Sequence, residues 1–161
     1  MGLKEDLEAK EQQCQTTEDF VNLAKEVMEG VSDKEWADRL FEDGAYWAAA
    51  SGDFLALAKG ALQVFGDKEK GKAYLDQGKT YCANVQELVN MAKAASEIGE
   101  AEAAKEIIVA AQAKCVKIKD FLDLSKIVQE VLSDEGLAGE TADKALAKCS
   151  RAADYNEYAK S

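Results

Sequence analysis

The residues best suited to chemistry in this sequence are its four cysteines, which recur at one position of a repeated pattern. They are Cys14, Cys82, Cys115 and Cys149, and Ala48 takes that position in the remaining copy. If the copies are stacked helices, equivalent positions lie roughly 9–10 Å apart. A disulfide needs Cα atoms within about 7 Å, and a zinc ion needs four ligands about 2.3 Å away. We therefore expect small buried hydrophobic residues in a reducing compartment rather than a metal or redox ladder.

Other residue types offer little material for catalysis. The chain has no histidine, which removes the commonest general base and the usual partner of a Ser or Cys nucleophile. Glu97, Glu100, Glu102 and Glu106 are close in sequence, but such a group is typical of a solvated turn and helix start. No glycine-rich phosphate loop or dinucleotide-binding turn is present. We expect a protein that is not an enzyme, with no catalytic residues, no cofactor and no metal.

The charge balance restricts the class of partner. The chain has 31 acidic and 20 basic residues and a formal net charge of −11. Nucleic acid is therefore not an expected partner, because its binding depends on cationic neutralisation of phosphates. A membrane is not expected either, since no apolar stretch approaches the roughly 18 residues that span a bilayer. The first residues do not resemble a signal peptide, which favours the cytoplasm.

The sequence repeats with a period of about 34 residues. Five segments share an acidic residue followed by an aromatic residue or leucine, and they begin at Asp19-Phe20, Asp53-Phe54, Glu87-Leu88, Asp120-Phe121 and Asp154-Tyr155. Successive segments are 34, 34, 33 and 34 residues apart, with a single-residue deletion near Gly99. The acidic residue is suited to capping free backbone N–H groups at a helix start. We therefore expect it to have a structural role.

Each repeat contains two amphipathic patterns with apolar spacings of three and four, separated by a short polar break. This predicts a helical hairpin of a first helix of roughly 13 residues and a second of roughly 17. The predicted helices are 3–16, 18–31, 33–50, 53–65, 67–83, 86–98, 100–117, 119–132, 135–151 and 153–160. We expect an all-α chain, a right-handed solenoid of antiparallel helical hairpins with about four and a half repeats, forming a single helical-repeat domain over 1–161.

The 34-residue helical period resembles that of tetratricopeptide or HEAT repeats. Gly44 with Trp47, and Gly78 with Tyr81, are similar to the Gly-x-x-aromatic spacing of the tetratricopeptide family. The chain departs from that family in having Asn90 where a small residue belongs and in having no proline. The resemblance implies that a protein or peptide is bound on a groove, and it assigns no functional residue.

A lysine recurs in all five copies, and a stripe of cations along the first-helix layer is expected. The five are Lys25, Lys59, Lys93, Lys126 and Lys160. Three of them precede a glutamate by four residues, which is typical of solvated ion pairs within one helix. The alternative is a stripe that meets an acidic partner or an anionic ligand.

Aromatic residues are concentrated in the second and third of the longer predicted helices. Trp47 and Tyr81 share a repeat position that becomes Lys114 and Lys148, so we expect this position to be at least partly exposed. Phe20, Phe54 and Phe121 fit core positions. The candidate binding residues are Trp47, Tyr81, Tyr46, Tyr74, Lys59 and Lys93.

These observations predict a protein-interaction or scaffolding module that binds a peptide or protein on a solenoid groove. One alternative is a self-associating structural helical protein, because the sequence ends part-way through a fifth repeat and an unfinished apolar helix could pair with another copy to form a homo-oligomer. A small-molecule-binding helical bundle is a further alternative.

Overall fold

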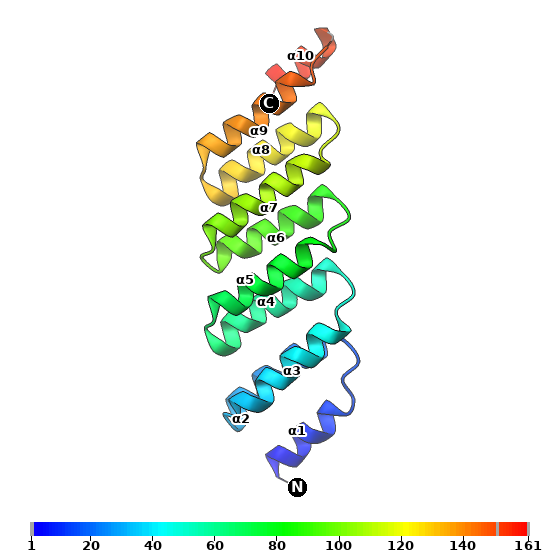
Figure 1. Ribbon diagram of the computed structural model, residues 1–161, viewed down its shortest axis with the longest axis vertical. Helices are drawn as coiled ribbons and strands as arrows, with labels where there is room; N and C mark the ends of the chain where they lie inside the picture. The colour runs from blue at the N-terminus through cyan, green and yellow to red at the C-terminus, as the bar shows by residue number, and fades with distance from the viewer. Residues whose placement is uncertain (1, 151, 161) are drawn as a thin grey trace. The chain divides into compact units, whose positions relative to one another are not determined.

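The computed structural model describes residues 2–150 and 152–160, and in these residues the chain is all-helical, as the sequence predicts (Figure 1). Helices pack in adjacent antiparallel pairs, and the described residues contain no strand. The helices are α1 (Leu3–Glu11), α2 (Thr17–Gly30), α3 (Lys34–Trp47), α4 (Ser51–Phe65), α5 (Lys68–Lys79), α6 (Val85–Glu97), α7 (Ala101–Lys114), α8 (Ile118–Leu132), α9 (Glu135–Ala147) and α10 (Ala152–Ala159). None of the described helices is both long enough and apolar enough to cross a membrane.

The chain divides into two compact units, residues 1–82 and residues 83–161. In unit 1, α2 pairs with α3 and α4 pairs with α5, while α2 also packs on α4 and α1 packs on α2. The interior contains the fully buried side chains of Leu7, Leu40, Phe41, Leu57 and Leu75. Phe20 and Phe54 are also buried, as the sequence predicts.

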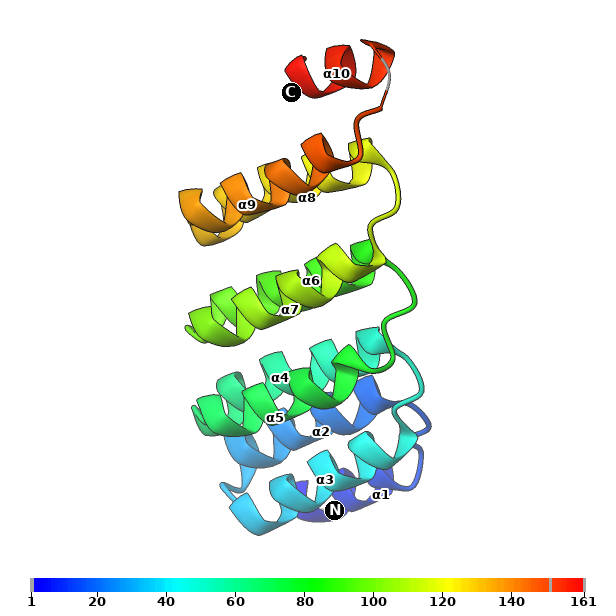
Figure 2. The same ribbon diagram turned by 45° about the horizontal axis from the view of Figure 1, so that its top comes forward.

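Unit 2 repeats the pairing with α6 against α7 and α8 against α9. Helix α6 also contacts α8, and α10 packs mainly on α8. Its interior contains Leu88, Met91, Ile107, Ile108 and Leu124, all of which are fully buried. In each unit the turns within pairs lie at one end of the helices and the linkers between pairs lie at the other end (Figure 2).

The turn within each helix pair contains one residue with a left-handed backbone. These residues are Ser32, Gly66, Gly99 and Ser133, with φ angles of 53°, 62°, 83° and 50°. Their sequence positions are 34, 33 and 34 residues apart. The single-residue deletion therefore lies in the α6 segment before Gly99, and α6 is correspondingly short at 13 residues.

An aspartate follows this turn residue in three of the four pairs and caps the second helix. Asp33, Asp67 and Asp134 each accept a hydrogen bond from the backbone N–H three residues later, at 3.0, 3.0 and 2.9 Å. Glu100 takes the same place before α7 but forms no side-chain cap. The additional methylene of glutamate changes the geometry that makes aspartate an effective N-cap.

The second helix of each pair is shorter than the sequence predicts. The predicted ends at residues 50, 83, 117 and 151 are replaced by ends at Trp47, Lys79, Lys114 and Ala147, and the first helix ends at Glu11 rather than at residue 16. The second helices have 14, 12, 14 and 13 residues, similar to the first helices of the pairs. The expected difference between a long and a short helix is therefore wrong.

The acidic residue of the following helix explains these early ends. Asp53 Oδ2 accepts hydrogen bonds from the backbone N–H groups of Ala49 and Ala50, at 2.9 and 3.0 Å. The backbone is already extended at Ala48, with ψ of 125°. Good helix formers in this segment thus give their N–H groups to the next helix start instead of continuing the previous helix.

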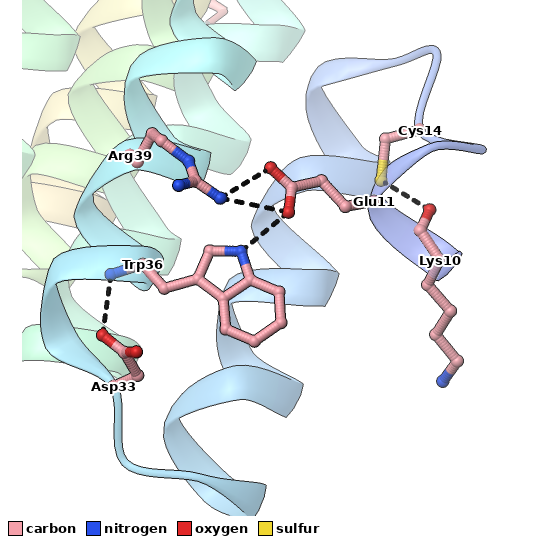
Figure 3. Close-up of polar contacts among 6 residues, drawn as sticks. All are labelled: Lys10, Glu11, Cys14, Asp33, Trp36 and Arg39. Atoms are coloured by element: carbon pink, nitrogen blue, oxygen red, sulfur yellow. Dashed lines mark hydrogen bonds and ion pairs between the residues drawn. The ribbon is translucent and has the colours of Figure 1, made fainter. Parts of the chain in front are cut away.

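Helix α1 is fixed to α3 through one carboxylate (Figure 3). Glu11 accepts a hydrogen bond from Trp36 Nε1 at 2.8 Å and two from Arg39 Nη2 at 2.9 and 3.1 Å. Lys10 additionally forms an ion pair with Glu26 of α2. Trp36 is consequently a buried core residue of unit 1, with its indole N–H satisfied.

Candidate functional site

The repeat position shared by Trp47, Tyr81, Lys114 and Lys148 is exposed in all four copies. Trp47 is 52% exposed and Tyr81 is 49% exposed. Trp47 is the last residue of α3, and Tyr81 lies just beyond the end of α5. The C-terminal ends of α3 and α5 lie on the same side of unit 1 (Figure 1). The change from aromatic residues to lysine along the repeats thus correctly indicated a position in contact with solvent.

Tyr81 is held in place by a core residue. Its ring packs on that of Phe54, with centroids 4.9 Å apart and ring planes tilted by 35°. Phe54 is in the first turn of α4 and is 3% exposed. One face of Tyr81 is therefore anchored, while about half of the side chain remains in contact with solvent.

Tyr46 is the most exposed of the candidate aromatic residues, at 87%. It precedes Trp47 at the end of α3, and Asp43 lies three residues before Tyr46 and four before Trp47. Residues with these spacings share one face of a helix. The Asp43 carboxylate on this face favours the approach of a positively charged group to the aromatic side chains. Among the described residues, no ring contact joins Trp47 to Tyr81.

Tyr74 differs from the other candidates because it belongs to the core of unit 1. It is 8% exposed and stacks on Phe41, with ring centroids 6.3 Å apart. Burial, together with the charges of Glu42 and Asp38, raises the pKa of its phenol to about 12. The sequence contained a signal for this burial, because Leu40 and Ile107 occupy the same repeat position. Little of the Tyr74 ring is accessible to a partner.

The recurring lysines lie on the first helices of the pairs. Lys59 is exposed on α4 in unit 1, and Lys93 is exposed on α6 in unit 2. Lys126 and Lys160 are exposed as well, whereas Lys25 is half-buried. The repeat thus places most of these ammonium groups in solvent, as expected for either solvated ion pairs or a charged binding surface.

The cysteines share one local hydrogen bond that sequence reasoning missed. Each thiol donates to the carbonyl oxygen four residues earlier, in Lys10, Gly78, Ala111 and Ala145, at 3.4–3.5 Å. Burial raises the pKa of Cys14, Cys115 and Cys149, and that of Cys115 reaches about 11. The protonated thiols therefore act as donors to the last turns of helices. In the described part of the chain, no three His, Cys, Asp or Glu side chains are arranged to hold a metal ion.

Ala48 occupies the repeat position that cysteine takes in the other copies. In this copy a hydroxyl group, rather than a thiol, donates to the carbonyl oxygen near the helix end. The carbonyl oxygen four residues earlier, in Gly44, accepts a hydrogen bond from Thr17 Oγ1 at 2.8 Å. Thr17 is buried at the start of α2. The same helix-end carbonyl is thus satisfied in this copy by a hydroxyl from the paired helix.

Comparisons of the chain with protein-family models, curated proteins and solved structures found no match. The exposed aromatic residues of unit 1, Tyr46, Trp47 and Tyr81, are hereafter called the aromatic surface.

Proposed function

We propose that this chain is a protein-interaction or scaffolding module, and that the aromatic surface of unit 1 binds a segment of a partner protein. The observation that carries the proposal is the exposure of three large aromatic side chains, at 49–87%, at the C-terminal end of α3 and just beyond that of α5. Tyrosine and tryptophan supply much of the binding energy in protein interfaces. Exposed aromatic residues without such a role would add only a tendency to aggregate.

The partner segment that fits best carries Lys or Arg next to an apolar side chain. Asp43 lies on the same helix face as Tyr46 and Trp47, and unit 1 belongs to a chain with a net charge of −11. A cation placed over an aromatic ring gains about 0.5–2 kcal/mol, depending on its desolvation. Tyr81 would offer a preformed contact, because Phe54 already restrains its ring.

The absence of histidine and the regular helix pairs support binding rather than catalysis. We further propose that the pairs continue as a right-handed solenoid of about four and a half repeats, resembling tetratricopeptide or HEAT arrays, and that the protein acts in the cytoplasm. No cofactor or metal is needed for this function.

The proposal is tested by replacing Tyr46 and Trp47 together with alanine. Proteins captured by the wild-type chain from an extract of its source are purified, and binding is measured with each purified component. We expect the double variant to weaken binding by at least about 30-fold, as loss of a hot spot of about 2 kcal/mol requires. Its melting temperature should change little, since both side chains are largely exposed.

Val109→Ala is the control, because Val109 is 54% exposed on α7 in unit 2 and the change removes an exposed apolar side chain elsewhere. Equal binding by the wild type and the double variant would refute the proposal. Sedimentation at several protein concentrations distinguishes the proposed binding module from the main alternative, a self-associating structural protein. Self-association of the wild type that is lost in the double variant would make the aromatic surface a contact between copies of the chain.

A further inference from the structure

The two ends of the helix pairs in unit 2 differ in their lysine content. The end that contains the turns within helix pairs has Glu97, Glu100, Glu102, Asp134 and Glu135. The opposite end, which contains the linkers after α7 and α9, has five lysines together with the acidic residues Glu87, Asp120, Asp143, Asp154 and Glu157 (Figures 1 and 2). The lysines are Lys114, Lys117, Lys119, Lys144 and Lys148.

The end that contains these lysines surrounds a cleft of about 420 Å³. The start of α8, the end of α9 and one side of α10 form its walls. Its lysines are Lys117, Lys119 and Lys148, and its acidic residues are Asp154 and Glu157. A smaller hollow of about 200 Å³ shares Lys119 and Glu157 and is also lined by Asp123 and Lys126 of α8 and by Lys160 after α10. The surface is therefore an elongated depression rather than a single point.

The lysines that line the cleft form no ion pair within the described part of the chain. They are Lys117, Lys119 and Lys148. Asp154, in contrast, accepts hydrogen bonds from the backbone N–H and the hydroxyl of Ser150, at 3.1 and 3.3 Å. Its carboxylate is thus partly committed to the linker.

Two of these lysines lie at the N-terminus of a helix, where a positive charge is unfavourable. Lys117 is the N-cap residue of α8, and Lys119 is in its first turn. The N-terminus of a helix carries a partial positive charge, so a cation at this place is unfavourable by a few tenths of a kcal/mol. The backbone N–H groups of Val116 and Lys117 donate to the Asp120 carboxylate, so the lysine side chains are not needed to cap the helix. An external anionic group would add to the compensation that the Asp120 carboxylate already provides in the first turn of α8.

An apolar side chain lies among the lysines. Val116 lines the cleft and is 75% exposed. A ligand that matches the whole surface therefore needs carboxylates for the ammonium groups and one aliphatic side chain for Val116. An extended peptide supplies both at the spacing of neighbouring residues.

We propose that the cleft formed by α8, α9 and α10 binds an acidic linear segment of a partner protein. Carboxylates of the segment pair with Lys117, Lys119 and Lys148, and an aliphatic side chain packs on Val116. The negative charge of the rest of the chain limits binding to short anionic segments and disfavours long polyanions. This site is separate in its residues and its chemistry from the aromatic surface of unit 1.

Fluorescence anisotropy tests the proposal with two labelled peptides. One contains Asp, Glu and Leu, and the other has Asn and Gln in place of the acidic residues. We expect only the acidic peptide to bind the full chain, with an affinity that falls as salt is added. Lys117→Glu combined with Lys148→Glu should weaken its binding by at least about tenfold.

Lys34→Glu combined with Lys68→Glu is the matched control. Both residues are exposed first residues of helices in unit 1, and this variant has the same net charge as the first. Its affinity should stay within about twofold of the wild type, because screened long-range charge contributes little. Circular dichroism checks that both variants fold, and Lys117→Gln with Lys148→Gln replaces the first variant if it does not.

The proposal is overturned if neither peptide binds, if the neutral peptide binds equally well, or if both double variants lose affinity equally. It is also overturned if a single-stranded DNA oligonucleotide binds more tightly than the acidic peptide and displaces it. Loss of peptide binding in the Tyr46→Ala, Trp47→Ala variant would likewise contradict the assignment to unit 2.

Discussion

At the scale of single residues, the cysteines illustrate how a repeated residue type can have a purely structural role. A thiol at the end of a helix is small and can donate to a carbonyl of the last helical turn. The carbonyls of Lys10, Gly78 and Ala145 accept a backbone N–H bond as well, so the thiol adds a second donor there. In the copy containing Ala48, the hydroxyl of Thr17 donates to the equivalent carbonyl, in Gly44. The cysteine column is therefore explained without any reactivity.

The pKa of Cys115 leads to a prediction about stability at high pH. Its folded-state pKa is raised from 9.0 to about 11, chiefly by burial, so the folded state holds the proton more tightly than the unfolded state. The resulting stabilisation is present in full below pH 9 and is lost as pH rises through about 11. We expect Cys115 to contribute about 1–3 kcal/mol to this loss.

Urea denaturation at several pH values between neutrality and pH 11 measures this effect. Cys115→Ala is the control, since alanine occurs naturally at the equivalent position, Ala48. All other side chains are the same in both proteins, so the difference between the two curves isolates the effect of the Cys115 thiol. A constant difference across this range would show that Cys115 does not titrate in the folded protein as described.

For the candidate binding residues Trp47 and Tyr81, solvent exposure could be predicted from the sequence, but the ring contact could not. Exposure of Trp47 and Tyr81 followed from lysine at the same repeat position, because an unpaired ammonium is rarely buried. The stacking of Tyr81 on Phe54 could not be foreseen, since it depends on how the linker after α5 crosses the start of α4. Tyr81→Ala should consequently reduce stability more than Trp47→Ala, although the two side chains are equally exposed.

At the scale of the helices, the close approach of α2 and α4 depends on one glycine. A Cβ atom at Gly60 would lie 2.6 Å from Val21 Cγ1 and 3.1 Å from Phe41 Cζ. Valine has little freedom to move in a helix, because its branched side chain strongly prefers one rotamer. The absence of a side chain at Gly60 therefore sets the distance between the two helix pairs of unit 1.

We expect Gly60→Ala to destabilise unit 1 by about 1–3 kcal/mol through overpacking, despite the higher helix propensity of alanine. Gly52→Ala is the matched control in the same helix, because no atom lies within 4 Å of a Cβ placed there. This control should be neutral or slightly stabilising. Urea denaturation followed by circular dichroism compares the two, and an unchanged midpoint for Gly60→Ala would mean that α2 and α4 are further apart.

Helix starts could be predicted from the sequence more accurately than helix ends. All ten predicted starts are within two residues of the observed ones, because acidic and capping residues mark them directly. Four second helices and α1 end three to five residues early. Residues such as Ala48 and Ala49 favour a helix locally, but Asp53 holds the adjacent N–H groups, so a contact with the next element overrides local propensity.

At the scale of the whole molecule, the chain contains two compact units with the same internal plan. Leu57 of α4 and Leu124 of α8 occupy equivalent repeat positions and are 0% and 1% exposed. Leu57 belongs to unit 1 and Leu124 to unit 2. Replacing either leucine with alanine removes similar apolar contacts and leaves a cavity, which costs about 2–5 kcal/mol.

The position of the substituted leucine should determine which helices lose stability. In a repeat architecture, stability is the sum of contributions from each element and its neighbours, so a cavity acts mainly on its surroundings. We expect Leu57→Ala to reduce hydrogen-exchange protection mostly in α2 to α5, and Leu124→Ala to reduce it mostly in α6 to α9. Amide exchange followed by mass spectrometry on the intact chain measures both patterns. An equal loss of protection in both units from either substitution would instead mean that residues 1–161 unfold as the single cooperative domain that the uninterrupted period predicts.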